Sequence, residues 1–178
     1  MRHFACALLL SATLLPLSGA TLERLSLSDL VTKSNAIVRG KVQSSSAAFR
    51  GRMIFTHYSV AVSEELKGSG GSTVDVAVPG GTANGIVQNF SGTPTFQVGD
   101  EFVFFLWSDK TGLNWITGLT QGLFSVAQDS PSNPTLTRKA THEMMLDPAT
   151  HQPVQDQDFS ISLADLRSQI ASILGVSK

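Results

Sequence analysis

Apolar and polar residues alternate along much of the chain between residues 36 and 138, and this pattern predicts a succession of β-strands. The alternation is clearest over residues 36–43 and 54–66. In the second stretch Ile54 and Tyr58 lie on the apolar face, with Phe55 and His57 opposite. Further strands are expected at residues 74–78, 85–88, 95–98, 102–107, 113–117, 123–126 and, as an edge strand, 136–138. The polar stretch 44–52 and the glycine-rich stretch 67–71 predict turns.

The strand expected at residues 102–107 differs from the others because its side chains are apolar without interruption. Such a run favours a strand that is buried on both faces. Trp107 ends this run, so we expect it to pack in the core, whereas the environment of Trp115 stays open.

Helical periodicity is found near each end of the chain. Ser26, followed by Asp29 three residues later, predicts the N-cap of a short helix within residues 21–35. Ser162 and Asp165 predict the same for an amphipathic helix over residues 161–175. The apolar stripe of this second helix allows packing on the sheet or on a second protein. The whole pattern predicts a mostly β protein, with a β-rich barrel or strongly bent sheet and a helix at each end.

The first twenty residues are expected to be a secretory signal peptide. Arg2 supplies a basic start, residues 4–15 are apolar, and small Ala20 places the cleavage site before Thr21. The apolar stretch is shorter than the about 20 residues of a membrane helix, so we expect no membrane span after cleavage. The expected organisation is a signal peptide over residues 1–20, a β-domain over 21–138, a polar loop over 139–160 and a helix over 161–175.

Composition excludes several classes of function. The one cysteine, Cys6, lies in the expected signal peptide, so the exported chain would have no disulfide, thiolate metal site or cysteine nucleophile. The formal net charge is −1 and no basic run is present, which argues against nucleic-acid binding. We expect a secreted or periplasmic monomer without a cofactor.

Four segments together resemble the netrin-like and tissue-inhibitor-of-metalloproteinase modules, a pattern shared by a set of secreted bacterial proteins. They are AIVRGKV at residues 36–42, YSVAVSEELKG at 58–68, VGDEFVFFL at 98–106 and LTQGLF at 119–124. The resemblance covers roughly residues 22–126 and implies an OB-like barrel of five to six strands.

The resemblance also implies a non-enzymatic module that binds another secreted or periplasmic protein, such as a protease. Animal inhibitors of this group chelate the protease zinc through an N-terminal cysteine and hold the barrel with disulfides. This chain would begin at Thr21 and has no cysteine there, so no inhibitory residue is carried over.

Loops of OB-like barrels often form binding surfaces, and the turn at residues 44–52 contains an exposed-looking aromatic residue among polar ones. The candidate binding residues are Phe49, Arg50, Arg52 and Trp115. One alternative is a cell-envelope module for glycans or small ligands, in which Trp115 and Trp107 would supply a stacking platform.

A second alternative is a metal-dependent hydrolase, centred on His57 or on residues 140–158. His57 is expected to point outward, where a nearby carboxylate would make it a general base. His142-Glu143 lacks the second histidine that a zinc-protease helix needs four residues on, because Leu146 stands there. The other polar residues of the loop match no metal-binding spacing. They are Asp147, His151, Asp156 and Asp158. We therefore expect no enzymatic activity.

Overall fold

The computed structural model describes residues 20–69, 71–130 and 132–175, and the expected signal peptide lies outside them except for Ala20. The chain is mostly β. The strands are β1 (Thr21–Glu23), β2 (Ala36–Arg50), β3 (Met53–Lys67), β4 (Thr73–Pro79), β5 (Gly81–Ala83), β6 (Ile86–Gln88), β7 (Glu101–Ser108), β8 (Asn114–Ile116), β9 (Leu123–Val126), β10 (Thr135–Arg138), β11 (Met144–Leu146), β12 (Pro153–Val154) and β13 (Phe159–Ser162). The helices are α1 (Leu27–Lys33), the 3-10 helix η1 (Leu119–Gly122) and α2 (Leu163–Leu174).

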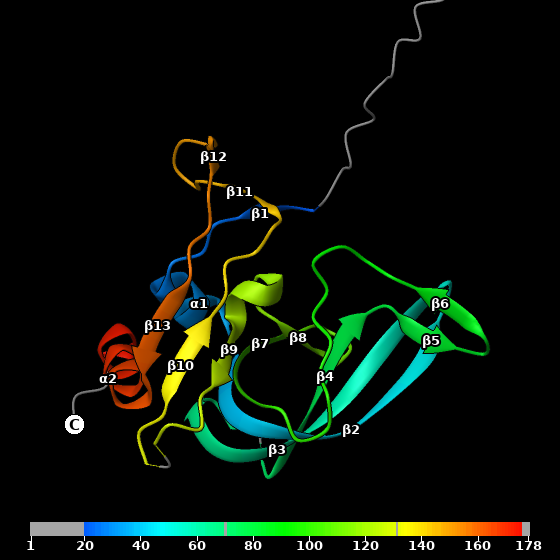
Figure 1. Cartoon of the computed structure of the whole chain (residues 1–178), viewed down its shortest axis with the longest axis horizontal. Helices are drawn as coiled ribbons and strands as arrows, with labels where there is room; N and C mark the ends of the chain where they lie inside the picture. Colours follow the sequence, from blue (N-terminus) through cyan, green and yellow to red (C-terminus); the bar gives the residue numbers. More distant parts are fainter. Residues whose placement is uncertain (1–19, 70, 131, 176–178) are drawn as a thin grey trace, which may run out of the picture.

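Five of the strands form a closed ring within a larger sheet (Figure 1). The sheet has the order β13-β10-β9-β7-β2-β3-β4-β8, and β8 also pairs with β7. The ring therefore runs β2-β3-β4-β8-β7 and back to β2. The β4–β8 pair is parallel, whereas the other four pairs of the ring are antiparallel. One edge of β7 is divided between β9, which pairs with Phe102–Phe104, and β8, which pairs with Leu106–Ser108.

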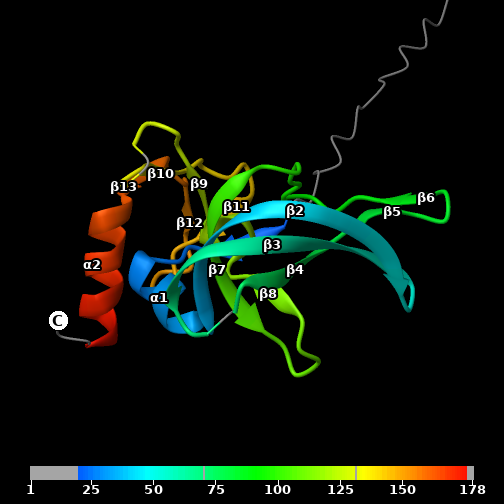
Figure 2. The same ribbon diagram turned by 90° about the horizontal axis from the view of Figure 1, so that it is seen from below.

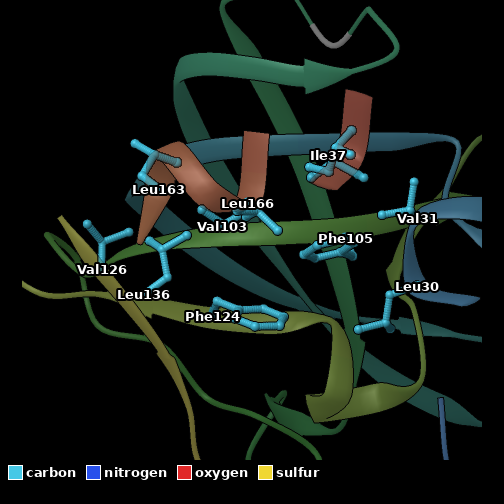
Figure 3. Packing of buried hydrophobic residues seen from close by; sticks show 11 residues of the cluster. Leu30, Val31, Ile37, Val103, Phe105, Phe124, Val126, Leu136, Leu163 and Leu166 are labelled. Atoms are coloured by element: carbon cyan, nitrogen blue, oxygen red, sulfur yellow. The ribbon is translucent and has the colours of Figure 1, made fainter. Parts of the chain in front are cut away.

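Strand β7 separates two hydrophobic cores, as its uninterrupted apolar run predicts. Val103 and Phe105 pack into the first, which we call the helix-side core (Figure 3). Phe104 and Leu106 pack into the second, which we call the ring core. Successive residues of a strand point to opposite faces, and both faces of β7 are covered, so all four side chains are fully buried. The ring core is completed by Val38, Val42, Tyr58, Val60, Val74, Val76, Val78, Phe96 and Ile116.

Both helices cover the helix-side core. Ser26 and Asp29 form a reciprocal capping box at the start of α1, as predicted. The helix is shorter than expected, because residues Thr21–Glu23 pair with β11 as a strand. In α2 the buried residues Leu163, Leu166 and Ile170 pack into the helix-side core (Figure 3). The apolar stripe of the C-terminal helix therefore packs on the chain's own sheet.

The β2–β3 hairpin extends far beyond the ring (Figure 2). The prediction of a turn over residues 44–52 is wrong, because β2 continues to Arg50 and only Gly51 and Arg52 form the turn. Serine and alanine are weak strand formers, but pairing along the whole of β3 imposes the extended conformation on them. Gly51 has a φ of +64°, which glycine at the first position of a two-residue hairpin turn adopts without strain. We call residues 44–59 the arm.

Register shifts near the base of the hairpin change the face of one predicted core residue. Ile54, Tyr58 and Val60 are buried on one face, as predicted. Leu66 packs against the helix-side core instead, because the register between β2 and β3 shifts between Gly40 and Arg39, opposite Ser63, and Leu66 itself lies at the next shift, between Val38 and Ile37. A one-residue shift turns every following side chain to the other face of a strand.

Three further segments differ from expectation. Residues 95–98 form no strand and are held by Phe96, whose ring packs on Tyr58 and Phe104. Strand β10 is not at the edge, because it pairs with both β9 and β13. Residues 139–160 contain β11, β12 and the start of β13. Among the described helices, none combines the length and apolar character needed to cross a membrane.

Candidate functional site

The four candidate binding residues lie on two different faces of the ring and arm. Phe49 pairs with Ile54, so it lies on the same face as that core residue, which we call the inner face. Arg50 pairs with Met53, and strand alternation places both on the opposite, outer face. Arg52 lies in the turn. Trp115 lies on the outer face of β8, because its neighbour Ile116 points into the ring core. The structure thus brings Arg50 to the same face as Trp115 and separates Phe49 from it.

Three aromatic side chains form a continuous row on the outer face. The ring centroids of Phe55 and Trp115 are 5.4 Å apart with an edge-to-face angle of 74°. Those of Trp115 and Trp107 are 6.3 Å apart at 27°, a stacked arrangement. We call these residues the aromatic row. Ala77 on β4 pairs with Trp115 and is only 1% exposed, because larger side chains on the neighbouring strands cover it.

Trp107 is the exposed end of the aromatic row. It is 41% exposed, so the prediction that it packs in the core is wrong. Val103 and Phe105 on the same face of β7 are covered by the helices, but Trp107 lies beyond the end of that cover. It packs on Trp115 and leaves much of its surface to solvent.

Asp109 holds Trp115 in place from the loop between β7 and β8. Its Oδ2 accepts a hydrogen bond from the Trp115 indole Nε1 at 3.1 Å. Its Oδ1 accepts bonds from the Thr111 hydroxyl and amide and from the Leu113 amide. The Thr111 hydroxyl bond is the main cause that lowers the pKa of Asp109 to about 2; burial opposes it, and the bonds from Trp115, Leu113 and the Thr111 amide add to the lowering. The carboxylate is therefore ionised at neutral pH, and the loop and the indole are fixed together.

His57 and Asp75 form a polar pair beside the aromatic row. The Nδ1 of His57 lies 2.8 Å from Asp75 Oδ2, and the two side chains are 31% and 54% exposed. Ser46 is the cross-strand neighbour of His57 on β2, but the described hydrogen bonds of the imidazole include no serine hydroxyl. The pair adds a histidine and an acidic group to the border of the outer face.

The acidic side chains within residues 140–158 form hydrogen bonds and ion pairs with nearby groups. Asp156 makes a bidentate ion pair with Arg138, at 2.5 and 2.9 Å, and Asp158 pairs with Lys139. Asp147 accepts bonds from the amides of its own turn, and Glu143 accepts one from Ser91. Within the described ranges, no three histidine or acidic side chains converge as a metal-binding group.

A cavity of about 380 Å³ lies between this segment and η1. Thr120, Thr137, Arg138 and His142 are among the residues that line it. The Thr120 hydroxyl is buried and has no hydrogen-bond partner among the described residues. The cavity is open, and its wall combines apolar, hydroxyl and charged side chains.

Sequence reasoning missed Phe55 and Asp109 as members of the site. Phe55 could have been identified, because alternation already places it opposite the core face of its strand. Asp109 precedes Lys110, Thr111 and Gly112, and aspartate followed by such residues is typical of a turn in which the side chain accepts backbone hydrogen bonds. Its bond to Trp115 depends on the β7–β8 register, which the sequence does not specify.

A comparison with known protein families, curated proteins and solved structures gives no match to this chain.

Proposed function

We propose that this protein is an exported, non-enzymatic module that binds another secreted or periplasmic protein through the outer face of its ring. The observation that carries this proposal is the aromatic row, in which exposed Trp107 stacks on Trp115 and Trp115 contacts Phe55. Burying an exposed tryptophan against a partner is among the largest contributions that one side chain makes to a protein interface.

The composition of the outer face supports a protein partner. Met53, 39% exposed, and Arg50 lie on this face between the aromatic row and the tip of the arm. Aromatic residues, methionine and arginine are enriched in protein interfaces, whereas lysine and glutamate are depleted. Asp109 fixes Trp115 before any partner arrives, so less side-chain entropy is lost on binding.

The ring supports the finer proposal of an OB-like barrel of the netrin-like type. Taken in chain order, its strands are arranged first-second-third-fifth-fourth, with the closing pair of third and fifth strands parallel. This is the arrangement expected of a five-stranded Greek-key barrel of the OB type. The resemblance to protease inhibitors makes an exported protease one partner to test. Export itself rests on the signal-peptide pattern of residues 1–20.

A glycan ligand is the second candidate function. The observation that favours it is the near-parallel stacking of Trp107 on Trp115, which leaves Trp107 able to pack against the apolar face of a sugar ring. This ligand would need the tryptophan but not the positive charge of Arg50.

The test is to compare ligand capture by the exported form of the protein and by two variants. Trp107→Ala removes the exposed end of the aromatic row. Val98→Ala is the matched control, because Val98 is 70% exposed in the loop before β7. We expect a captured exported protein to be retained by the unchanged protein and by Val98→Ala, and lost with Trp107→Ala. Binding on a glycan array that is lost only with Trp107→Ala would favour the second candidate. A ligand that Trp107→Ala retains fully would contradict both.

A further inference from the structure

Strand β2 has a stretch with a partner on one side only. β7 pairs with β2 over Ala36–Lys41, whereas residues 44–50 pair with β3 alone among the described strands. Six of these seven residues are exposed, and Ala47 is half-buried because Gly81 of β5 approaches it from the inner face. Strand β5 belongs to a separate two-stranded sheet and forms no ladder with β2. We call the side of residues 44–50 that faces away from β3 the free edge (Figure 2).

The pairing register shows which backbone groups point toward the free edge. The Ile54 carbonyl accepts the Gly80 amide, and the Ile54 amide donates to Gln88 Oε1. Both groups of Ile54 thus point away from β2, so Ile54 and its partner Phe49 form a non-hydrogen-bonded pair. Because such pairs alternate along an antiparallel ladder, Ser45, Ala47 and Phe49 direct their N–H and C=O groups to the free edge.

Within residues 44–49 the free edge lacks the features that protect natural sheet edges. This stretch contains no charged residue and no proline, and the nearest register shift between β2 and β3 lies just before it, between Val42 and Ser44. Exposed edges are usually blocked by lysine, proline or a bulge. Three residues in this spacing present six groups that match the backbone of one extended polypeptide segment.

Charge at the tip of the arm indicates what this segment carries. Arg50 and Arg52 have no ion-pair partner among the described residues, and residues 44–62 contain no aspartate or glutamate. An antiparallel pairing of two copies of the arm would therefore bring no carboxylate to either arginine. A foreign segment with an acidic residue at that end would pair with them.

We infer that the free edge of β2 binds an extended segment of another polypeptide by strand addition. The segment is uncharged along Ser45–Phe49 and acidic where it reaches Arg50 and Arg52. This inference deepens the proposed binding function, but it uses the backbone edge and not the aromatic row. The two can therefore fail separately.

The probe is a decapeptide selected from a displayed random library against the exported form of the protein, and then synthesised. Hydrogen exchange followed by NMR should show that the peptide protects the amides of Ser45, Ala47 and Phe49. The amides of Ser46 and Ala48 are already bonded to β3 and should not change. This alternation is a signature that binding to the outer face would not produce.

Proline variants test the same edge from the side of the protein. Ser45→Pro and Ala47→Pro each remove one outward amide without removing a bond to β3, and proline is tolerated at such edge positions. Each should weaken peptide binding about tenfold or more, because a hydrogen bond to the peptide is lost and the pyrrolidine ring of the proline obstructs the added strand. The controls Ser45→Ala and Ala47→Ser should bind the peptide as the unchanged protein does.

A variant of the peptide keeps the test decisive if a proline substitution disturbs folding. Methylation of the peptide amides that face Ser45, Ala47 and Phe49 should abolish binding to the unchanged protein. Three results would overturn the inference. The first is that no selected peptide loses binding to the proline variants or on methylation of its amides. The second is that the amides of Ser45, Ala47 and Phe49 are already protected in the free monomer. The third is that a second copy of the chain protects these amides in a dimer.

Discussion

Leu166→Ala is the substitution that most directly tests the packing of the C-terminal helix. Leu166 is fully buried in the helix-side core, between α2 and the sheet. Leucine-to-alanine changes at buried sites cost about 2.7–5.0 kcal/mol, with larger costs where the cavity cannot collapse. Because α2 lies on the surface of the domain and can move inward, we expect about 3 kcal/mol. For a domain of this size that corresponds to a lowering of Tm by about 6–12 °C.

The measurement is equilibrium urea unfolding followed by far-ultraviolet circular dichroism. The midpoint should fall while the slope of the unfolding free energy against urea concentration stays the same. Leu174→Ala is the matched control, because it makes the same chemical change on the same helix at a residue that is 39% exposed. Alanine is also a good helix former, so we expect this control to cost less than about 1 kcal/mol.

The reasoning would be refuted if the two variants differed by less than about 1 kcal/mol, a difference too small for a buried leucine. That result would mean that α2 is not part of the folded core and that its apolar stripe serves another purpose.

Three other changes should also have measurable effects. Gly40→Ala should lower stability by about 1–3 kcal/mol in the same urea assay, because a Cβ there would lie 2.6 Å from the Ala61 carbonyl oxygen; unchanged stability would contradict this packing. Asp156→Asn should cost about 3 kcal/mol, because it leaves the mostly buried Arg138 guanidinium without its carboxylate. Burial raises the pKa of Asp156, but the Arg138 hydrogen bond and the other bonds to this carboxylate outweigh burial and lower it. The contribution of Asp156 to the free energy of unfolding is therefore complete above about pH 4 and is lost as the pH falls through its folded-state pKa. In an acid titration of stability, the asparagine variant should not show this loss. Trp107→Ala should cost only about 1 kcal/mol by calorimetry, and a loss as large as that of a core residue would argue against an exposed binding role.

Local pattern predicted those parts of the fold in which side chains alternate strongly or caps are explicit. The two-sided burial of β7 follows from an uninterrupted apolar run, and the Ser26 and Ser162 caps follow from their spacing to an acidic residue. The extension of β2 through residues 44–50 could not be predicted in this way. Those serines and alanines are strands only because β3 offers a long partner, and that pairing is not a property of the segment itself.

The candidate site was predicted only in part, because it is assembled across strands. Trp115 was identified from its residue type, but its contact with Phe55 depends on the placement of β4 between β3 and β8. Trp107 was expected in the core because the preceding residues Val103–Leu106 are all buried. The helices cover this face of β7 only as far as Phe105, and that limit is set by tertiary packing. Phe49 and Arg50 are adjacent in the sequence, yet strand pairing puts them on opposite faces.

The position of β7 between the two cores has a consequence for the cooperativity of folding. The ring closes only when β7 pairs with both β2 and β8. The opposite face of β7 supplies Val103 and Phe105 to the helix-side core, so that core also depends on β7. Because the two cores share β7, we expect them to unfold together. Calorimetric and van't Hoff enthalpies of unfolding should be equal, and probes in α2 and in the ring should report one common transition. The protein would thus lose the proposed binding surface and its C-terminal helix in the same event.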